Sequence, residues 1–297
     1  MAHGDATCQQ ATAAQVKSAC VHSSVADDAE SDRNDGPGEL VMTKLADYAE
    51  RYRGVHFSRD NAGVLEMVLH TRGGPALWGS SPESLHGELG EAFLDVARDP
   101  ENKVVLLTGT GDSFIAGFDA TGSYPEASLA AMWPRIYNEG LALLNNLLAI
   151  PVPMIAAVNG PALFHAELAA LCDIVLAATH AEFADLAHVP GGGAVPGDGV
   201  HTVWPMLLGP NRGRYFLLTG ERIGAEEARR IGVVGEVLAP EALMPRAREL
   251  AANLAKLPTP MLRYTRTLLT RELRKRMLDE LPSGLAHEAL ATLLPPG

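Results

Sequence analysis

Residues 151–162 of the chain read PVPMIAAVNGPA, and residues 172–178 read CDIVLAA. Each contains an uninterrupted apolar run, Met154–Val158 in the first and Ile174–Ala178 in the second. Short apolar runs bounded by turn residues are typical of strands that are covered on both faces, as in parallel sheets. Because a helical stretch separates the two runs, the sequence predicts an α/β fold with much parallel sheet.

The same pattern continues on both sides of this stretch. Val64–His70 and Val104–Thr108 are further strand candidates, and Ser84–Arg98 has the spacing of an amphipathic helix between them. After residue 200 the pattern is mainly helical. There we expect, among others, separate helices at Met261–Leu278 and Gly284–Leu294.

Composition divides the chain into three regions. Residues 1–40 contain no aromatic residue and are rich in Ala, Ser and Asp, which predicts a disordered tail without a catalytic role. We expect a core at 41–238 and a helical region at 239–297, whose leucine-rich faces could cover a pocket or pack on another subunit.

Charge argues against nucleic acid as a partner. The chain of 297 residues has 36 acidic and 24 basic residues, a formal net charge of −12. Such a surface repels phosphate backbones unless it has a local basic patch. The densest basic stretch, Arg263–Arg276, has helical spacing, and we interpret it as a solvated helix face.

Other partners are constrained by what the sequence lacks. Its three cysteines are too few and too scattered for a disulfide framework or a zinc cluster. No apolar run reaches the roughly 18–20 residues that span a bilayer, and the first residues have no apolar signal segment. We therefore expect a cytoplasmic protein that binds no membrane.

Four loop segments contain residues that could take part in chemistry: 113–119, 159–167, 185–199 and 283–290. The first follows a strand and could leave backbone N–H groups free to bind an oxyanion, although an ordinary turn has the same pattern. The second contains His165 and Glu167, which could equally be a buried core histidine and a helix-capping glutamate. In the fourth, Glu288 could face either a pocket or solvent.

The third segment contains His188 and Asp198 on a loop rich in glycine and proline. A histidine whose ring nitrogen is held by a carboxylate is a common general base, since the anion raises its basicity and fixes its tautomer. His201 could pair with Asp198 instead. The chain has no Gly-x-Ser-x-Gly, phosphate-loop or His-Glu-x-x-His motif, so we expect neither serine nucleophile chemistry nor a bound metal.

The succession LLTGTGDSFIAGFD (106–119), PVPMIAAVNGPA (151–162) and CDIVLAA (172–178) resembles the crotonase superfamily over residues 41–297. The resemblance implies a spiral of ββα turns with a C-terminal helical trimerisation region, assembled as homotrimers or dimers of trimers. It also implies an oxyanion hole made of two backbone N–H groups, the first at Phe118. The glycine run that usually supplies the second donor is replaced here by PALFHAE (161–167).

This departure, with VPGDG (195–199), VWP (203–205), NRGRYFLLTG (211–220) and GLAHEALA (284–291), resembles a branch of the superfamily that works without coenzyme A. This branch contains the β-diketone hydrolases of the 6-oxocamphor hydrolase type, which cleave bicyclic β-diketones. The resemblance implies site roles for Trp78, His165, His188, Asp198 and Glu288, and implies no cofactor.

The implied reaction is a retro-Claisen hydrolysis of a small, non-enolisable β-diketone to a keto acid. Asp198 orients His188, which deprotonates water, while His165 and Trp78 hydrogen-bond the carbonyl oxygens and Glu288 assists proton movement. Two alternatives stay open. One is a hydratase or isomerase of coenzyme A thioesters that uses Glu167 as acid and base, and the other is a scaffold without catalytic activity.

Overall fold

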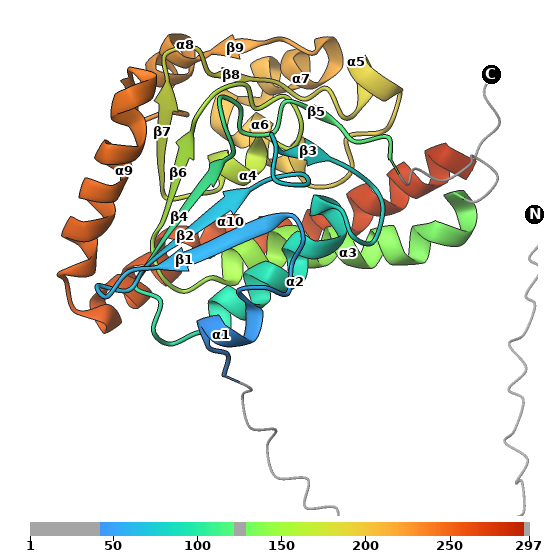
Figure 1. The fold of residues 1–297 in the computed structure, drawn as a ribbon. Helices are drawn as coiled ribbons and strands as arrows, with labels where there is room; N and C mark the ends of the chain where they lie inside the picture. Colours follow the sequence, from blue (N-terminus) through green and yellow to red (C-terminus); the bar gives the residue numbers. More distant parts are fainter. Residues whose placement is uncertain (1–41, 122–128, 294–297) are drawn as a thin grey trace, which may run out of the picture. The chain divides into compact units, whose positions relative to one another are not determined.

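The structure is a computed structural model that describes residues 42–121 and 129–293 (Figure 1). The tail expected at residues 1–40 lies outside the described residues. The division of the remaining chain at residue 238 stays a prediction. No helix among the described residues is both long enough and apolar enough to cross a membrane.

A mixed sheet of six strands forms the centre, in the order β1-β2-β4-β6-β7-β10. Its strands β1 and β2 pair antiparallel, and every other neighbouring pair is parallel. β4, β6 and most of β7 are buried along their length, which explains their unbroken apolar sequences. The bounds are Val55–Arg59 (β1), Val64–Leu69 (β2), Val104–Gly109 (β4), Met154–Val158 (β6), Ile174–Ala178 (β7) and Glu236–Leu238 (β10).

Two small sheets lie beyond the ends of these strands. In one, β3 (Leu77–Trp78) pairs parallel with β5 (Gly117–Phe118), so that Trp78 lies beside Phe118. In the other, β8 (Glu182–Phe183) pairs antiparallel with β9 (Ile223–Gly224). The small sheets therefore gather loops that are distant in sequence.

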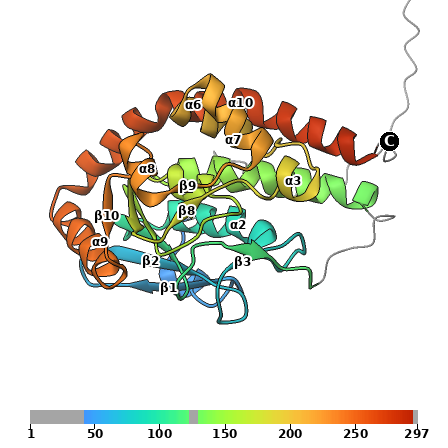
Figure 2. The same cartoon turned by 90° about the horizontal axis from the view of Figure 1, so that it is seen from above.

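Helices cover the central sheet on both faces. On one face α9 packs on strand residues such as Leu106 and Ile155, and on the other α2 and α3 enclose the larger core. Figure 2 shows the long α10 running beside α3. The helices span Leu45–Tyr48 (α1), Leu85–Arg98 (α2), Leu129–Ala149 (α3), Glu167–Ala170 (α4), Val189–Gly192 (α5), Val200–Leu208 (α6), Pro210–Thr219 (α7), Ala225–Arg230 (α8), Pro240–Ala255 (α9) and Thr259–Leu293 (α10).

The two helices expected at the end of the chain are one continuous helix, α10, so that prediction was wrong. Pro282 lies inside the helix, where it removes one hydrogen bond of the helix and its ring crowds the preceding turn. The buried residues Met277, Leu281 and Leu285 recur at helical spacing across it. The packing of these residues outweighs the local tendency of proline to end a helix, and α10 continues through Pro282 to Leu293. The expected assembly into trimers stays a prediction.

The turn after β4 interlocks with the turn after β6. The side chain of Asn159 accepts a hydrogen bond from the N–H of Gly109 at 3.1 Å and donates one to the carbonyl of Gly111 at 2.8 Å. A methyl group on Gly160 would overlap the carbonyl oxygen of Asp112. The interlocked turns fix the start of the loop that leads to His165.

We expect Gly160→Ala to lower the free energy of unfolding by about 1–3 kcal/mol, because the added methyl group meets backbone that cannot move aside. Urea denaturation followed by circular dichroism measures the change. Gly224→Ala is the matched control, since no atom lies within 4 Å of the position that its methyl group would take, and its φ of −69° suits alanine. Equal stability of the two variants would contradict the interlock.

Candidate active site

A cavity of about 220 Å³ lies between the β3–β5 pair, α3 and the last turns of α10. It contains all six residues that the sequence predicted for the site. Its lining residues are Trp78, Ser80, His86, Phe118, Trp133, Ile136, Phe164, His165, Ala187, His188, Asp198, Leu285, Glu288 and Thr292. The fold therefore gathers side chains from separate loops and helices around one small space.

His188 is buried, with 2% of its surface exposed, and both ring nitrogens face carboxylates. Its Nδ1 lies 2.7 Å from Oδ1 of Asp185, and its Nε2 lies 3.2 Å from Oδ2 of Asp198. The expectation that Asp198 orients the ring was incomplete, because the carboxylate on Nδ1 belongs to Asp185. His201 is not the partner of Asp198, and its Nδ1 has no hydrogen bond.

A second histidine repeats this arrangement. His165 Nδ1 lies 2.7 Å from Oε1 of Glu167, and its Nε2 lies 3.4 Å from the same Asp198 oxygen that faces His188. The ring stacks on Trp78 with centroids 3.7 Å apart. Glu167 thus stands behind a histidine, outside the residues that line the cavity. Asp198 joins two histidines that each have a carboxylate of their own.

His165 lies in the segment PALFHAE (161–167), where the resemblance to the crotonase superfamily predicts glycines. Its φ of 49° is in the left-handed region, which favours glycine and which few other residues adopt. The preceding N–H groups of Leu163 and Phe164 both donate to the carbonyl of Ile115. These two amides are therefore engaged, and the polar group that this loop brings to the cavity is the side chain of His165.

Phe118 lies at the more open side of the cavity, with 47% of its surface exposed. Its ring faces Phe164 at a centroid distance of 6.4 Å. The next amide, of Asp119, donates to the carbonyl of Trp78 in β3. Since successive peptide groups in a strand point to opposite sides, the N–H of Phe118 points away from β3. This direction leaves it as the candidate backbone donor that the sequence predicted.

The charges in the cavity are strongly coupled. Burial disfavours the imidazolium form of His188, but the carboxylates of Asp198 and Asp185 outweigh it and raise the pKa of His188 to about 12. For His165, burial is likewise outweighed by Glu167 and Asp198, and its pKa is raised. Burial opposes ionisation of Asp198, yet the two histidines hold its pKa well below the usual range. The arrangement therefore favours the anionic form of Asp198 and the protonated form of both rings.

Glu288 differs from the other acids of the site. Burial, and then the negative charge of Asp198, raise the pKa of its carboxyl group to about 8. Its Oε2 is buried and has no hydrogen-bond partner. A methyl group on Gly197 would come within 3.0 Å of the Cβ of Glu288, so the loop that carries Asp198 runs directly against α10. At neutral pH Glu288 is a protonated acid that faces the cavity.

Sequence reasoning missed a third histidine, His86 on α2. It is buried against the cavity, and its Nδ1 lies 3.0 Å from Oε2 of Glu139 on α3. Both oxygens of Glu139 accept hydrogen bonds from Arg135. The signal was weak, because His86 sits in an amphipathic helix where a buried histidine is usually structural. Its partner is distant in sequence, so no spacing could reveal the pair.

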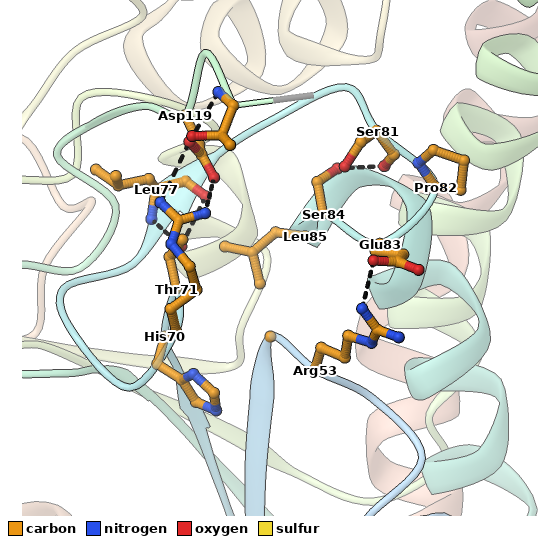
Figure 3. Close-up of a pocket in the computed structure, with 13 residues that line it drawn as sticks. Arg53, His70, Thr71, Leu77, Ser81, Pro82, Glu83, Ser84, Leu85 and Asp119 are labelled. Atoms are coloured by element: carbon orange, nitrogen blue, oxygen red, sulfur yellow. Dashed lines mark hydrogen bonds and ion pairs between the residues drawn. The ribbon is translucent and has the colours of Figure 1, made fainter. Parts of the chain in front are cut away.

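A larger cavity of about 570 Å³ lies near the loop between β2 and β3 (Figure 3). Its charges are already paired, Arg72 with Asp119 at 2.7 Å and Arg53 with Glu83 at 2.5 Å. Among the described residues that line it, no histidine faces a carboxylate. The smaller cavity therefore holds the groups that can move protons. Within residues 42–121 and 129–293, no cluster of three or more His, Cys, Asp and Glu side chains could hold a metal ion.

Comparison with known proteins places these features in a family. Residues 59–289 match the model of the enoyl-CoA hydratase/isomerase family. Carnitinyl-CoA dehydratase of Citrobacter koseri is 36% identical over 208 residues, which cover 67% of this chain and 74% of that protein.

Among solved structures, a beta-diketone hydrolase of Anabaena sp. PCC 7120, bound to (S)-3-oxocyclohexyl acetic acid, is 44% identical. The match has a TM-score of 0.77 and covers 81% of this chain and 94% of that one. An enoyl-CoA hydratase/isomerase of Mycobacterium paratuberculosis is 26% identical, with a TM-score of 0.70 and coverage of 82% and 94%. With its sheet, its long C-terminal helix and the match over most of its length, the chain belongs to the enoyl-CoA hydratase/isomerase family, within the crotonase superfamily.

Proposed function

We propose that the protein hydrolyses a carbon–carbon bond of a small cyclic β-diketone without coenzyme A. The observation that carries the proposal is the pair of histidines, each backed by its own carboxylate and both facing Asp198 inside the cavity. Such paired groups suit the activation of water and the stabilisation of a developing oxyanion. The 44% identity to a beta-diketone hydrolase supports the same reaction.

In the proposed reaction, neutral His188 removes a proton from water, with Asp185 holding the other ring nitrogen in the required tautomer. The hydroxide adds to one carbonyl carbon of the 1,3-diketone, and the new oxyanion accepts hydrogen bonds in the cavity. We assign one of these hydrogen bonds to His165, whose ring lines the cavity and whose Nδ1 is held by Glu167.

The bond between the attacked carbonyl carbon and the central carbon then breaks. Its electron pair forms an enolate with the second carbonyl, whose oxygen the remaining donors stabilise. Protonated Glu288 gives its proton to the enolate carbon, and the acid regains it as His188 releases the proton taken from water. The products are one carboxylic acid and one ketone, in a single molecule where the substrate is cyclic.

The rival activity is a coenzyme A thioester reaction, which the match to carnitinyl-CoA dehydratase favours. It needs Glu167 to reach the substrate. In the structure the carboxylate of Glu167 is bonded to His165 and does not line the cavity. That position favours a supporting role for Glu167 and therefore the diketone reaction.

The test is incubation of the pure protein with monocyclic and bicyclic 1,3-diketones, and separately with enoyl-CoA and hydroxyacyl-CoA thioesters. We expect loss of diketone with release of a keto acid, and no hydration or dehydration of thioesters. Turnover of a thioester that Glu167→Gln abolishes, with every diketone left intact, would overturn the proposal.

The pH dependence of the proposed reaction follows from two raised pKa values. Neutral His188 increases as the pH rises toward about 12, whereas protonated Glu288 is lost above about 8. The wild-type kcat/KM, which reports the pKa values of the free protein, should therefore rise with pH up to about 8 and then level off. We expect Glu288→Gln to lower kcat/KM about 100-fold, within the usual contribution of a general acid. In this variant kcat/KM should keep rising beyond pH 8. A plateau that stays at pH 8 in this variant would exclude Glu288 as its cause.

A further inference from the structure

One wall of the cavity is fixed by a contact between two helices. Trp133 on α3 lines the cavity with 7% of its surface exposed. Its indole N–H donates to the hydroxyl of Thr292 on α10 at 2.5 Å. The hydroxyl in turn donates to the carbonyl of Ala289 at 2.8 Å. An indole nitrogen only donates, and a hydroxyl has a single proton, so the direction of both bonds is determined.

This short chain of hydrogen bonds holds the indole in one orientation. Trp133 and Ile136 are one turn apart on α3 and both line the cavity, so they form a continuous apolar wall. Thr292 lies one turn beyond Glu288 on α10, and both face the same space. The wall is therefore tied to the helix turn that carries the proposed acid.

The size of the cavity makes this wall important. At about 220 Å³ it is smaller than the roughly 300–1,000 Å³ that is usual for ligand pockets. Phe118, Phe164 and Leu285 supply further apolar lining. In so small a space, one indole is a large part of the boundary. Close packing around it leaves few ways to admit additional substrate atoms.

We propose that Trp133, held by Thr292, sets the upper size of the ring system that the site accepts, and that the substrates are compact cyclic diketones without a bulky substituent on that side. The proposal rests on the proposed function for its substrate class. Thr292 acts through Trp133 and is a positioning residue, whereas Trp133 contacts the substrate.

The test compares kcat/KM for a compact bicyclic 1,3-diketone and for the same diketone with an added alkyl substituent. We expect Thr292→Val, which keeps the shape but loses the acceptor, to raise the relative kcat/KM for the larger diketone about tenfold, the effect of roughly one methylene in an apolar pocket. Trp133→Phe should shift the ratio in the same direction and further. Thr292→Ser should restore the wild-type ratio because it retains the hydroxyl.

Thr267→Val is the matched control. This threonine is exposed on the same helix, and its hydroxyl bonds only within the helix, to the carbonyl of Arg263. An unchanged ratio in both Thr292→Val and Trp133→Phe, with the compact diketone still hydrolysed, would overturn the inference and leave the proposed function standing.

If the wild-type protein hydrolyses no diketone, the proposed function fails first. Size selection is then measured by calorimetry, with a compact and a substituted cyclic ketone as binding probes. Tighter binding of the substituted ketone by Thr292→Val than by wild type would support the wall. Equal binding by both proteins, or no binding of either ketone to the wild type, would overturn it.

Discussion

His188→Gln should lower kcat for diketone hydrolysis by about 10⁴-fold, the upper end of what a general base contributes. Glutamine keeps a polar group of similar reach between the two carboxylates but has no basic nitrogen that could accept a proton from water. KM should change little, because the apolar walls that bind the ring are untouched. Initial rates measured by loss of diketone absorbance, with product quantified by chromatography, give both constants.

The choice of glutamine follows from the hydrogen bonds that His188 can make. Alanine would leave Asp185 and Asp198 buried with neither a cation nor a hydrogen-bond donor between them, which costs several kcal/mol of stability. The amide of glutamine can still donate to one of these carboxylates. A loss of activity in His188→Ala could therefore come from unfolding. His56→Gln is the control, since His56 is exposed on β1. A His188→Gln variant that retains even a tenth of wild-type kcat would remove His188 from the base role.

The central strands could be predicted from sequence because a strand that is buried on both faces needs an unbroken apolar run, and the chain contains such runs between turn residues. Met154–Val158 and Ile174–Ala178 have the predicted bounds in the structure. The edge strand β1, Val55–Arg59, was not predicted, because its apolar residues alternate with exposed ones over too short a stretch. Local signals failed again at Pro282, where tertiary packing carries α10 through a residue that normally ends a helix.

The site shows a similar division between what a sequence reveals and what only folding determines. The chemistry-bearing residues His188 and Asp198 stand out because they lie on a glycine-rich loop. The sequence does not show which carboxylate faces which ring nitrogen, because that depends on side-chain positions that differ by only a few ångströms. Asp185 lies three residues before His188 and bonds its Nδ1, a geometry that spacing alone cannot distinguish from a bond to Asp198.

This geometry separates the roles of the two aspartates. Asp185 touches only the Nδ1 side of His188, where it fixes the ring tautomer, whereas Asp198 lies at Nε2 of both histidines. An asparagine at position 185 can donate its amide N–H to Nδ1 and so drive the ring proton to Nε2. The nitrogen that should accept a proton from water is then already protonated.

We therefore expect Asp185→Asn to lower kcat by about 10⁴-fold, as misplacing the tautomer does in other histidine-based sites. Asp198→Asn should cost less, because Asp185 still holds Nδ1 and the lost anion lowers the pKa of His188, which increases its neutral form. Nitrogen NMR of the labelled imidazoles reports which ring nitrogen carries the proton in each variant.

Comparing the two asparagine variants shows which carboxylate orients His188, since each substitution removes one negative charge next to that histidine. If Asp198→Asn is the more damaging and also moves the ring proton, Asp198 rather than Asp185 is the orienting residue, and the water must approach His188 from its other nitrogen. If Asp185→Asn moves the proton and abolishes turnover, the base is a His188–Asp185 pair, and Asp198 serves to hold the two imidazoles at the cavity.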